Sequence, residues 1–309
     1  MEKVLVMGGS YFIGKHVVET LKDAYQVTVL NRGNQPLNDP LITELVADRN
    51  DSVAITSLLR EKLFDHVIDI SAYTSDQLDI LVKALDMTYL KTYLFISSGA
   101  VYDPSNPLPI KENMALGGNS PYAQYAKDKI ACENYLESMV PHEKLFIIRP
   151  PFVYGEDNYL LRERLIFHLI ENNDPVFIPK SNNHIQFIYV KDLAKIISSM
   201  IKRTYRANTY NVGMNESIHF DAFVKACAKA MNKEVTIKWV DLDNVPTTHY
   251  FPFYPMNYVL DVSNLNNQLV VQTELLEGLK AAYHDYLKIK PINLPKRTID
   301  AIKKLKSSL

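Results

Sequence analysis

The chain has 309 residues, 47% of them hydrophobic and 22% charged, which is enough to build one large α/β domain or two lobes. Its formal net charge of −1 provides no electrostatic footprint for a polyanion, so we expect no nucleic-acid partner. No apolar run approaches the roughly 18 residues that cross a bilayer, so we expect a soluble protein with no membrane partner.

The first predicted element is a strand over Val4–Met7, which breaks into a glycine-rich turn and then a helix over Phe12–Leu21. A strand, a glycine turn and a helix in this order form the pyrophosphate site of dinucleotide-binding folds. The backbone and the helix N-terminus can approach the anion there, although many such turns need glycine for steric reasons alone. The predicted cofactor contacts are Gly8, Ser10, Tyr11, Phe12, Ile13 and Gly14.

The next two predicted strands end in polar residues that would face the cofactor ribose and adenine. Asn31 can hydrogen-bond a hydroxyl, and the guanidinium fork of Arg32 suits the 2′-phosphate of NADP. This favours NADP over NAD, unless Arg32 is simply a solvated turn residue. Asp48 and Arg49, at the end of the third strand, are further predicted cofactor contacts. Asp48 would accept a hydrogen bond from the adenine amino group or would be an acid at the N-terminus of the next helix.

Six continuous apolar runs, typical of buried parallel strands, alternate with helical patterns. The predicted strands are Val4–Met7, Val27–Leu30, Glu44–Ala47, His66–Ile70, Thr92–Ile96 and Leu145–Ile148. The predicted helices are Phe12–Leu21, Val53–Lys62, Gln77–Leu85 and Tyr122–Met139. Repeated βα units predict an α/β fold with a doubly wound parallel sheet of the NAD(P)-binding Rossmann type. Further predicted cofactor contacts at the ends of these strands are Ser71, Ala72 and Pro150.

After Pro151 the pattern changes, which predicts a smaller second lobe that is discontinuous in sequence. We place the dinucleotide-binding domain at residues 1–150, completed by about 186–212, and the substrate-binding lobe at residues 151–185 and 213–309. The aromatic stretch at residues 250–258 is too rich in proline for regular structure, and we expect it to pack that lobe rather than bind a ligand.

Tyr125 and Lys129 are four residues apart, so both lie on one face of a predicted helix. The same Tyr-x-x-x-Lys spacing begins again at Tyr11 and at Tyr286, so context must choose among the three pairs. Only Tyr125 follows a core strand that ends in hydroxyl side chains, among them Ser98, at the carboxyl edge where open α/β sheets bind ligands.

A tyrosine base near neutral pH needs its pKa lowered from about 10 by about 3 units, or roughly 4 kcal/mol. One positive charge about 6 Å away, at an effective dielectric near 20, contributes roughly 2.8 kcal/mol. Lys129 together with an oxidised nicotinamide ring could therefore supply the shift, while Ser98 would hydrogen-bond the substrate oxygen. The alternative is that Tyr125 and Lys129 are surface helix residues and that Ser98 caps a loop.

Two cysteines, Cys132 and Cys227, lie in helix-patterned segments without CxxC spacing, and no signal-peptide pattern precedes them. We expect reduced, packed thiols, a cytoplasmic location and no metal site. The basic C-terminal segment is predicted to be a solvated surface helix rather than a nucleic-acid-binding arm.

At these residues the chain resembles the extended short-chain dehydrogenase/reductase superfamily, which includes nucleotide-sugar epimerases and dehydratases. The resemblance rests on the glycine turn, on Ser98 with Tyr125 and Lys129, and on the motif-like runs at residues 149–155, 187–192 and 210–213. The turn, the Asn-Arg-Gly strand end and the Tyr-Phe-Pro-Phe stretch look most like an atypical branch with chloroplast stem-loop RNA-binding proteins. The chain is similar, more distantly, to isoflavone reductase-like enzymes.

Three residues depart from the pattern of the nucleotide-sugar epimerases. Tyr11 stands at the usual middle glycine of the turn, Phe152 replaces an asparagine, and Ile185 replaces the arginine that grips the nucleotide diphosphate. These departures argue against a nucleotide-sugar substrate unless other cations contact the diphosphate. The candidates for that contact are Arg162, Arg164, Lys180 and His184.

The resemblance implies an NAD(P)-dependent oxidoreductase or epimerase that acts on a hydroxyl or keto group of a small substrate. Tyr125 would be the base, Ser98 would orient the substrate oxygen, and Lys129 would lower the pKa of Tyr125 and hold the nicotinamide ribose. The alternatives are an NADPH-dependent reductase of the isoflavone reductase-like type and a non-catalytic dinucleotide-sensing or RNA-binding protein. RNA-binding relatives tend to lose the Tyr-x-x-x-Lys pair, so its retention favours an enzyme. The family also implies a homodimer through helices that flank the sheet, including Tyr122–Met139.

Overall fold

The structure is a computed structural model that describes residues 1–117, 121–202, 205, 207–242, 245–269 and 272–307. It divides into two compact units, each made of three chain segments. Unit 1 comprises Met1–Pro151, Val190–Asn215 and Leu260–Val271, and unit 2 comprises Phe152–Tyr189, Glu216–Val259 and Gln272–Leu309. Within the described residues, no helix is both long and apolar enough to span a lipid bilayer.

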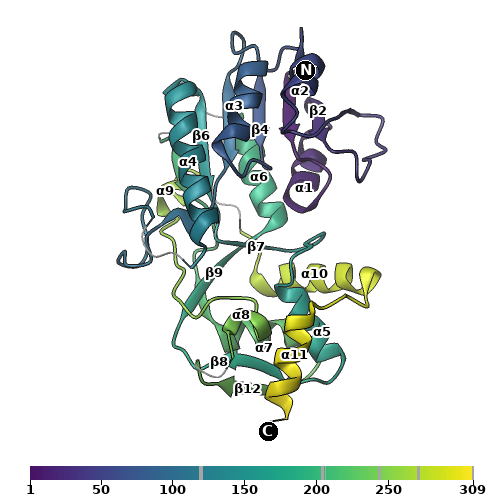
Figure 1. Cartoon of the computed structure of the whole chain (residues 1–309), viewed down its shortest axis with the longest axis vertical. Coiled ribbons are helices and arrows are strands. Elements are labelled where there is room, and N and C mark those ends of the chain that lie inside the picture. Colours follow the sequence, from purple (N-terminus) through teal and green to yellow (C-terminus); the bar gives the residue numbers. More distant parts are fainter. Residues whose placement is uncertain (118–120, 203–204, 206, 243–244, 270–271, 308–309) are drawn as a thin grey trace. The chain divides into compact units, whose positions relative to one another are not determined.

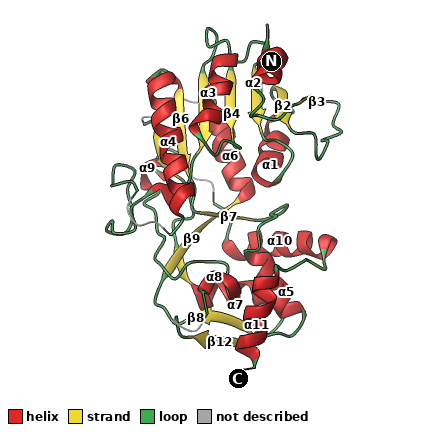
Figure 2. Ribbon diagram, in the orientation of Figure 1, coloured by secondary structure: helices red, strands yellow, loops and turns green. Residues whose placement is uncertain are grey.

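Unit 1 is built on a sheet with the strand order β10-β6-β5-β4-β1-β2-β3, in which all neighbours within the described chain are parallel (Figures 1 and 2). Its strands are β1 (Lys3–Met7), β2 (Gln26–Asn31), β3 (Ile42–Val46), β4 (His66–Asp69), β5 (Thr92–Ile96), β6 (Leu145–Arg149) and β10 (Thr209–Asn211). The winding direction reverses between β1 and β4, which makes this the switch point where open α/β sheets bind ligands. The predicted doubly wound parallel sheet is confirmed.

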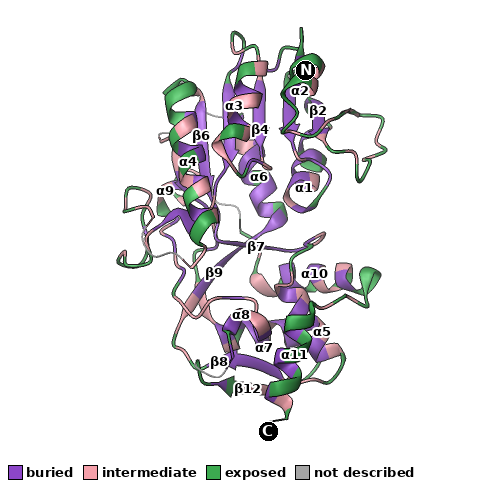
Figure 3. Cartoon of the chain, viewed as in Figure 1, coloured by how far each residue is buried: buried purple, intermediate pink, exposed green. Residues whose placement is uncertain are grey.

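The helices of unit 1 cover both faces of the sheet. They are α1 (Phe12–Leu21), α2 (Ser52–Leu59), α3 (Ser75–Ala84), α4 (Ala123–Met139), α6 (Val190–Met200) and α9 (Ser263–Asn266), with 3-10 turns η1 (Gly99–Val101) and η2 (His142–Lys144). α2, α3 and α4 pack side by side over one face and share a hydrophobic cluster with the strands. α1 packs against α6, on the other face, as right-handed crossovers require. The central strands β4, β5 and β6 are buried along their whole length, the edge strand β3 is not, and the outer helix faces are exposed (Figure 3).

Unit 2 combines two small sheets with a group of helices. Its strands are β7 (Phe152–Tyr154), β8 (Val176–Pro179), β9 (His184–Tyr189), β11 (Ser217–His219) and β12 (Ile237–Val240). Its helices are α5 (Glu163–Glu171), α7 (Phe220–Met231), α8 (Thr247–Tyr250), α10 (Leu275–Ile289) and α11 (Lys296–Lys306). β9 pairs with β7 and with β11, β8 pairs with β12, and α5, α7 and α10 pack on one another.

The unit boundaries differ from the prediction in two places. We expected the first domain to resume at about residue 186, but β9 belongs to unit 2 because it forms a sheet with β7 and β11. We also assigned everything after residue 213 to the second lobe, whereas residues 260–271 return to unit 1. The reason is apolar burial, since Leu260 and Val262 pack with Val101, Tyr102 and Ile110 in a separate cluster.

The proline-rich aromatic stretch packs unit 2, as predicted. Phe251 and Phe253 are each 1% exposed. The ring of Phe253 lies 4.7 Å from that of Phe152 and 5.6 Å from that of Phe187, between centroids. Aromatic pairs at these distances contribute beyond their buried area.

Glu171 joins three helices of unit 2 at their C-terminal ends. Its carboxylate accepts a hydrogen bond from the Tyr283 hydroxyl of α10, and lies 3.1 Å from the ammonium of Lys233 and 3.1 Å from that of Lys290. The Tyr283 hydrogen bond and these two lysines lower the pKa of Glu171 to about 2. Its negative charge is therefore part of how α5, α7 and α10 are held together.

Candidate active site

The turn between β1 and α1 requires glycine at two positions. Gly8 has a φ of +92°, and a Cβ on it would lie 2.7 Å from the Cβ of Ser71, which follows β4. A Cβ on Gly14 would lie 1.9 Å from the carbonyl oxygen of Gly8. The backbone of the turn is therefore packed tightly at the switch point, with no side chain between the turn and the start of α1.

Tyr11, at the usual middle glycine of the turn, adopts an extended backbone with φ −128° and ψ 147° at the N-cap of α1. The residue is 45% exposed, so Tyr11 is not packed into the core of unit 1. Phe12 begins α1 with a φ of +38° and is buried.

The ends of β2 and β3 carry the residues predicted to face ribose and adenine. The Asn31 amide donates to Glu44 at 2.7 Å, and its oxygen accepts from the Gly33 N–H at 2.6 Å. Arg32 is exposed, and its charge acts on Asp48. Hydrogen bonds from Asn50 are the main cause that lowers the pKa of Asp48, and Arg32 adds to the effect. The cap of α2 is Asp51, which accepts from the Ala54 N–H at 2.9 Å, so Asp48 is not the capping acid.

Arg49 turns inward to a buried carboxylate at the end of β4. Its Nη1 and Nη2 each lie 2.9 Å from an oxygen of Asp69, and Nη1 also donates to the Ser71 hydroxyl at 2.7 Å. Burial opposes ionisation of Asp69, but the charge and hydrogen bonds of Arg49 prevail and lower its pKa. The guanidinium therefore binds the end of β4 and the loop that follows it. A direct contact of Arg49 with a cofactor stays a prediction.

Lys129 lies in the second turn of α4 and points into the edge of the sheet. Its Nζ donates to the carbonyl oxygens of Ala72 and Ile96, both at 2.8 Å, at the ends of β4 and β5. It also lies 4.5 Å from the ring centroid of Phe95 and 5.6 Å from that of Tyr73. Only 3% of the residue is exposed, and this burial lowers the pKa of Lys129 to about 8.

Tyr125 and Ser98 occupy the same edge. Tyr125 is in the first turn of α4, and its ring centroid lies 6.1 Å from that of Tyr73. Ser98 follows β5, and its Oγ accepts from the Ala100 N–H at 3.1 Å. Ile96, whose carbonyl holds Lys129, precedes Ser98 by two residues, so the structure gathers the three predicted catalytic residues around the ends of β4 and β5.

A buried polar network anchors α4 to the neighbouring strands. Glu133, one turn after Lys129, accepts from the Ser97 hydroxyl and from Arg149 Nε at 3.0 Å and Nη2 at 2.5 Å. Arg149 Nη1 donates to the Tyr102 hydroxyl at 2.9 Å. The predicted contact Pro150 follows Arg149, and its carbonyl accepts from the Gly99 N–H at 2.9 Å. The network fixes the backbone on which Ser98 and Lys129 are placed.

The other Tyr-x-x-x-Lys pairs have different surroundings. Tyr11 and Lys15 lie in the glycine turn and α1. Tyr286 is 1% exposed in α10 of unit 2, and Lys290 bonds to Glu171 at 3.1 Å. Neither pair lies at the ends of β4 and β5, which supports the choice of the pair in α4.

The cations considered for a diphosphate lie in unit 2 with protein partners. Arg164 pairs with Asp285 at 3.2 Å, Lys180 pairs with Asp241 at 2.8 Å, and Arg162 donates to the Val153 carbonyl at 2.8 Å. The His184 ring lies 3.7 Å from that of His219, between centroids. Phe152 and Ile185, which depart from the epimerase pattern, are both buried.

The sequence did not point to Asp69, to Tyr73 or to the pairing of Glu133 with Arg149. A signal existed for Asp69, because an acid that ends an otherwise apolar run at the carboxyl edge of a sheet calls for a partner. Nothing in the spacing identified Arg49 as that partner. Within the described residues, no group of three or more His, Cys, Asp or Glu side chains could hold a metal ion.

Comparisons with known proteins give a consistent result. The model of the NAD dependent epimerase/dehydratase family matches residues 4–213. Among curated proteins, the chloroplast stem-loop binding protein of 41 kDa b from Arabidopsis thaliana is 29% identical over 92% of this chain and 79% of its own. The UDP-glucose 4-epimerase of Bacillus subtilis is 25% identical over 77% of this chain and 85% of its own.

Solved structures show the same fold at low identity. A UDP-N-acetylglucosamine 4-epimerase from Methanobrevibacter ruminantium superimposes with a TM-score of 0.77 and 23% identity, over 93% of this chain and 98% of its own. A UDP-glucose 4-epimerase from Thermus thermophilus, solved in complex with NAD, gives 0.74 and 21% over 94% of this chain and 100% of its own.

Proposed function

The chain belongs to the NAD dependent epimerase/dehydratase family, and from this premise we propose that Ser98, Tyr125 and Lys129 form the catalytic site of an enzyme of this type. The observation that carries the proposal is the position of Lys129, whose ammonium bonds to the ends of β4 and β5 and is 3% exposed. A lysine on a solvated helix face keeps its ammonium in water, and burial of one is costly without a role. This placement therefore argues against a mere surface helix.

The residues at the switch point fit a nicotinamide dinucleotide. Gly8 and Gly14 place no side chain at these two positions of the turn, as close approach of a pyrophosphate requires, and Tyr11 is 45% exposed. When bound, the nicotinamide ring accepts or returns a hydride at the substrate carbon. We propose that Asn31 and the exposed Arg32 meet the adenosine ribose, with Arg32 favouring a 2′-phosphate.

The three catalytic residues have complementary roles in the proposal. With a pKa of about 8, Lys129 is mostly protonated at neutral pH and presents its positive charge near Tyr125 in the preceding turn. That charge favours ionisation of the phenol, so Tyr125 removes the proton of a substrate hydroxyl. The Oγ of Ser98 already accepts from Ala100, so its own proton is directed to the substrate oxygen.

We propose a small substrate with a hydroxyl or keto carbon, and nucleotide sugars are the class to test first. Several relatives are named for nucleotide-sugar substrates, for example the UDP-glucose 4-epimerase of Bacillus subtilis. Phe152 and Ile185 are buried in the aromatic core of unit 2 and in β9, so neither position grips a diphosphate. Recognition of such a group would have to use other residues, among which Arg162 lies at the start of α5.

The test begins with the purified protein, which is denatured so that any released dinucleotide can be identified and is then titrated with NAD, NADH, NADP and NADPH. Turnover is followed with UDP-sugars, by interconversion of sugars and by formation of reduced cofactor. Tyr125→Phe should lower turnover by at least about a hundredfold, because a general base contributes on that order. Tyr286→Phe, at the same spacing in α10, is the matched control and should leave turnover intact. Equal turnover of Tyr125→Phe and the control would remove Tyr125 from the mechanism.

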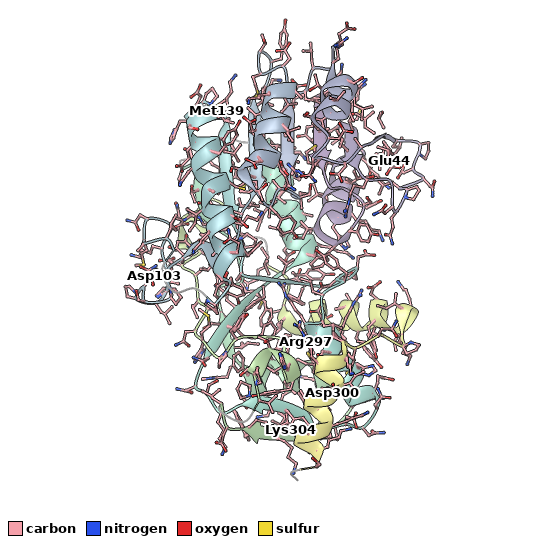
Figure 4. The ribbon with its side chains drawn as sticks, viewed as in Figure 1. Glu44, Asp103, Met139, Arg297, Asp300 and Lys304 are labelled. Carbon is pink, nitrogen blue, oxygen red and sulfur yellow. The ribbon has the colours of Figure 1, made fainter. Side chains whose placement is uncertain are left out.

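A second candidate function is binding of a nucleic-acid stem-loop. It is favoured by one observation, the 29% identity to the chloroplast stem-loop binding protein over 92% of this chain. The basic C-terminal helix α11 is the segment to consider for such binding. It carries Arg297 and Lys304, with Asp300 between them (Figure 4). This function predicts an affinity for RNA hairpins that falls steeply with salt and does not change in Tyr125→Phe. The absence of hairpin binding at low salt would eliminate it.

A further inference from the structure

The ion pair of Asp69 and Arg49 lies beside the proposed site but has no part in the mechanism above. Asp69 ends β4, is 0% exposed, and is the register neighbour of Phe95 in β5. The ammonium of Lys129 lies over the ring of that same Phe95. The pair is therefore one strand away from the lysine.

A short loop connects the carboxylate of Asp69 to the ammonium of Lys129. Asp69 Oδ1 accepts from the Ser71 N–H at 3.2 Å and from the Ala72 N–H at 3.0 Å. The carbonyl of Ala72 in turn accepts from Lys129 Nζ at 2.8 Å. Arg49 binds both Asp69 and the Ser71 hydroxyl, so it holds the same loop from a second side.

Stability alone does not explain this pair. Replacement of buried ion pairs by apolar residues is often neutral or stabilising, because desolvation offsets the attraction. Arg49 Nε is buried and has no hydrogen-bond partner among the described residues, which adds to the cost of this pair. A buried arrangement that is costly and incompletely satisfied is typical of a functional site.

We propose that Asp69 is the positioning residue for Lys129. Together with Arg49 it fixes the loop at residues 70–72, so that the Ala72 carbonyl holds the ammonium at the edge of the sheet where the cofactor and Tyr125 meet. The inference rests on the proposed function for its catalytic meaning, but the geometry can be tested without any substrate.

The charges around Lys129 determine whether replacement of Asp69 raises or lowers the pKa of Lys129. Burial lowers the pKa of Lys129, the carboxylates of Asp69 and Glu133 raise it, and Arg49 lowers it. In Asp69→Asn the negative charge is lost while Arg49 remains, so the pKa of Lys129 falls further. A larger neutral fraction and a looser clamp both make the amine more reactive.

The experiment is competitive labelling of lysines with acetic anhydride between pH 6 and 10, read by mass spectrometry of the peptide that contains Lys127 and Lys129. Lys127 is exposed in the same helix and is the internal reference. In Asp69→Asn, labelling of Lys129 relative to Lys127 should rise by about tenfold at neutral pH, as expected for loss of one charge-assisted hydrogen bond, and its midpoint should move to lower pH. Tyr93→Phe removes only the 3.3 Å bond from the Tyr93 hydroxyl to Asp69 and should match the wild type.

Relative labelling and a midpoint equal to the wild type in folded Asp69→Asn would overturn the proposal. If Asp69→Asn does not fold, Arg49→Lys is the second variant, because it keeps a cation beside the carboxylate but cannot form the bidentate bond. It should raise the labelling of Lys129 by a smaller factor. No rise in this variant would also overturn the proposal. Titration with NADH, followed by fluorescence, tests the proposed function separately from the role of Asp69. A wild type that does not bind NADH contradicts the proposed function, whereas the labelling result decides the role of Asp69.

Discussion

The buried pair of Glu133 and Arg149 permits a quantitative test of how unit 1 is held together. Their side chains are 2% and 5% exposed, and Arg149 Nη2 lies 2.5 Å from Glu133 Oε2. Glu133→Gln removes the negative charge and keeps the shape of the side chain. It leaves the guanidinium in the interior without a counter-charge, with neutral acceptors alone: the glutamine oxygen, the Tyr102 hydroxyl and the Glu112 carbonyl.

Loss of one partner of a buried ion pair costs about 3–5 kcal/mol. Because a glutamine oxygen can still accept one N–H, we expect the lower end, about 3 kcal/mol, which is roughly a hundredfold in the equilibrium between folded and open states. Arg149→Met should be similarly destabilising. The double variant should recover part of the loss, with a coupling energy of about 2 kcal/mol, since neither charge is then left alone.

The assay is amide hydrogen exchange of the peptides that cover β5 and β6, which reports unit 1 directly. The single tryptophan of the chain, Trp239, lies in β12 of unit 2 and would report the other unit. Glu137→Gln, an exposed glutamate one turn further along α4, is the matched control. Exchange of β5 and β6 in Glu133→Gln within about threefold of that in Glu137→Gln would refute the reasoning.

Three further predictions follow from the geometry. Gly14→Ala should abolish dinucleotide binding in a titration, because its Cβ would lie 1.9 Å from the Gly8 carbonyl, and binding by a folded Gly14→Ala variant would contradict the proposed turn. The pKa of Glu171, lowered from 4.5 to about 2, adds stability that is complete above pH 4.5 and lost as the pH falls toward 2. Trp239 fluorescence in an acid titration should show this loss in the wild type and less of it in Glu171→Gln; parallel curves would argue against it. Arg32→Ala should weaken NADP more than NAD by about tenfold, consistent with one charge-assisted bond to phosphate, and equal losses would assign Arg32 to solvent.

Periodicity and turn chemistry were sufficient to predict the architecture of unit 1. Phe12–Leu21 and Thr92–Ile96 are observed with the predicted bounds. Apolar runs buried on both faces leave little choice but a parallel sheet, and the glycines of the first turn have no sterically acceptable replacement. The strand order then places Gly8 and Ser71 side by side, although 62 residues separate them in the sequence.

Long-range partners could not be predicted in this way. The spacing of Tyr125 and Lys129 gave a helix face, but the ammonium is held in the interior by two carbonyls, one in the loop after β4 and one in β5. The inward turn of Arg49 depends on Asp69, 20 residues further along the chain. The return of residues 260–271 to unit 1 depends on the apolar partners of Leu260, which no local pattern reveals.

The interleaved segments of the two units have a consequence for synthesis of the chain. Unit 1 begins at Met1, but its last segment, Leu260–Val271, leaves the ribosome only after most of unit 2 has been made. Until then, Val101, Tyr102 and Ile110 lack the side chains of Leu260 and Val262, which complete their apolar cluster. The nascent protein therefore exposes an incomplete hydrophobic cluster through about half of its elongation, which gives a chaperone that shields apolar chain time to bind there.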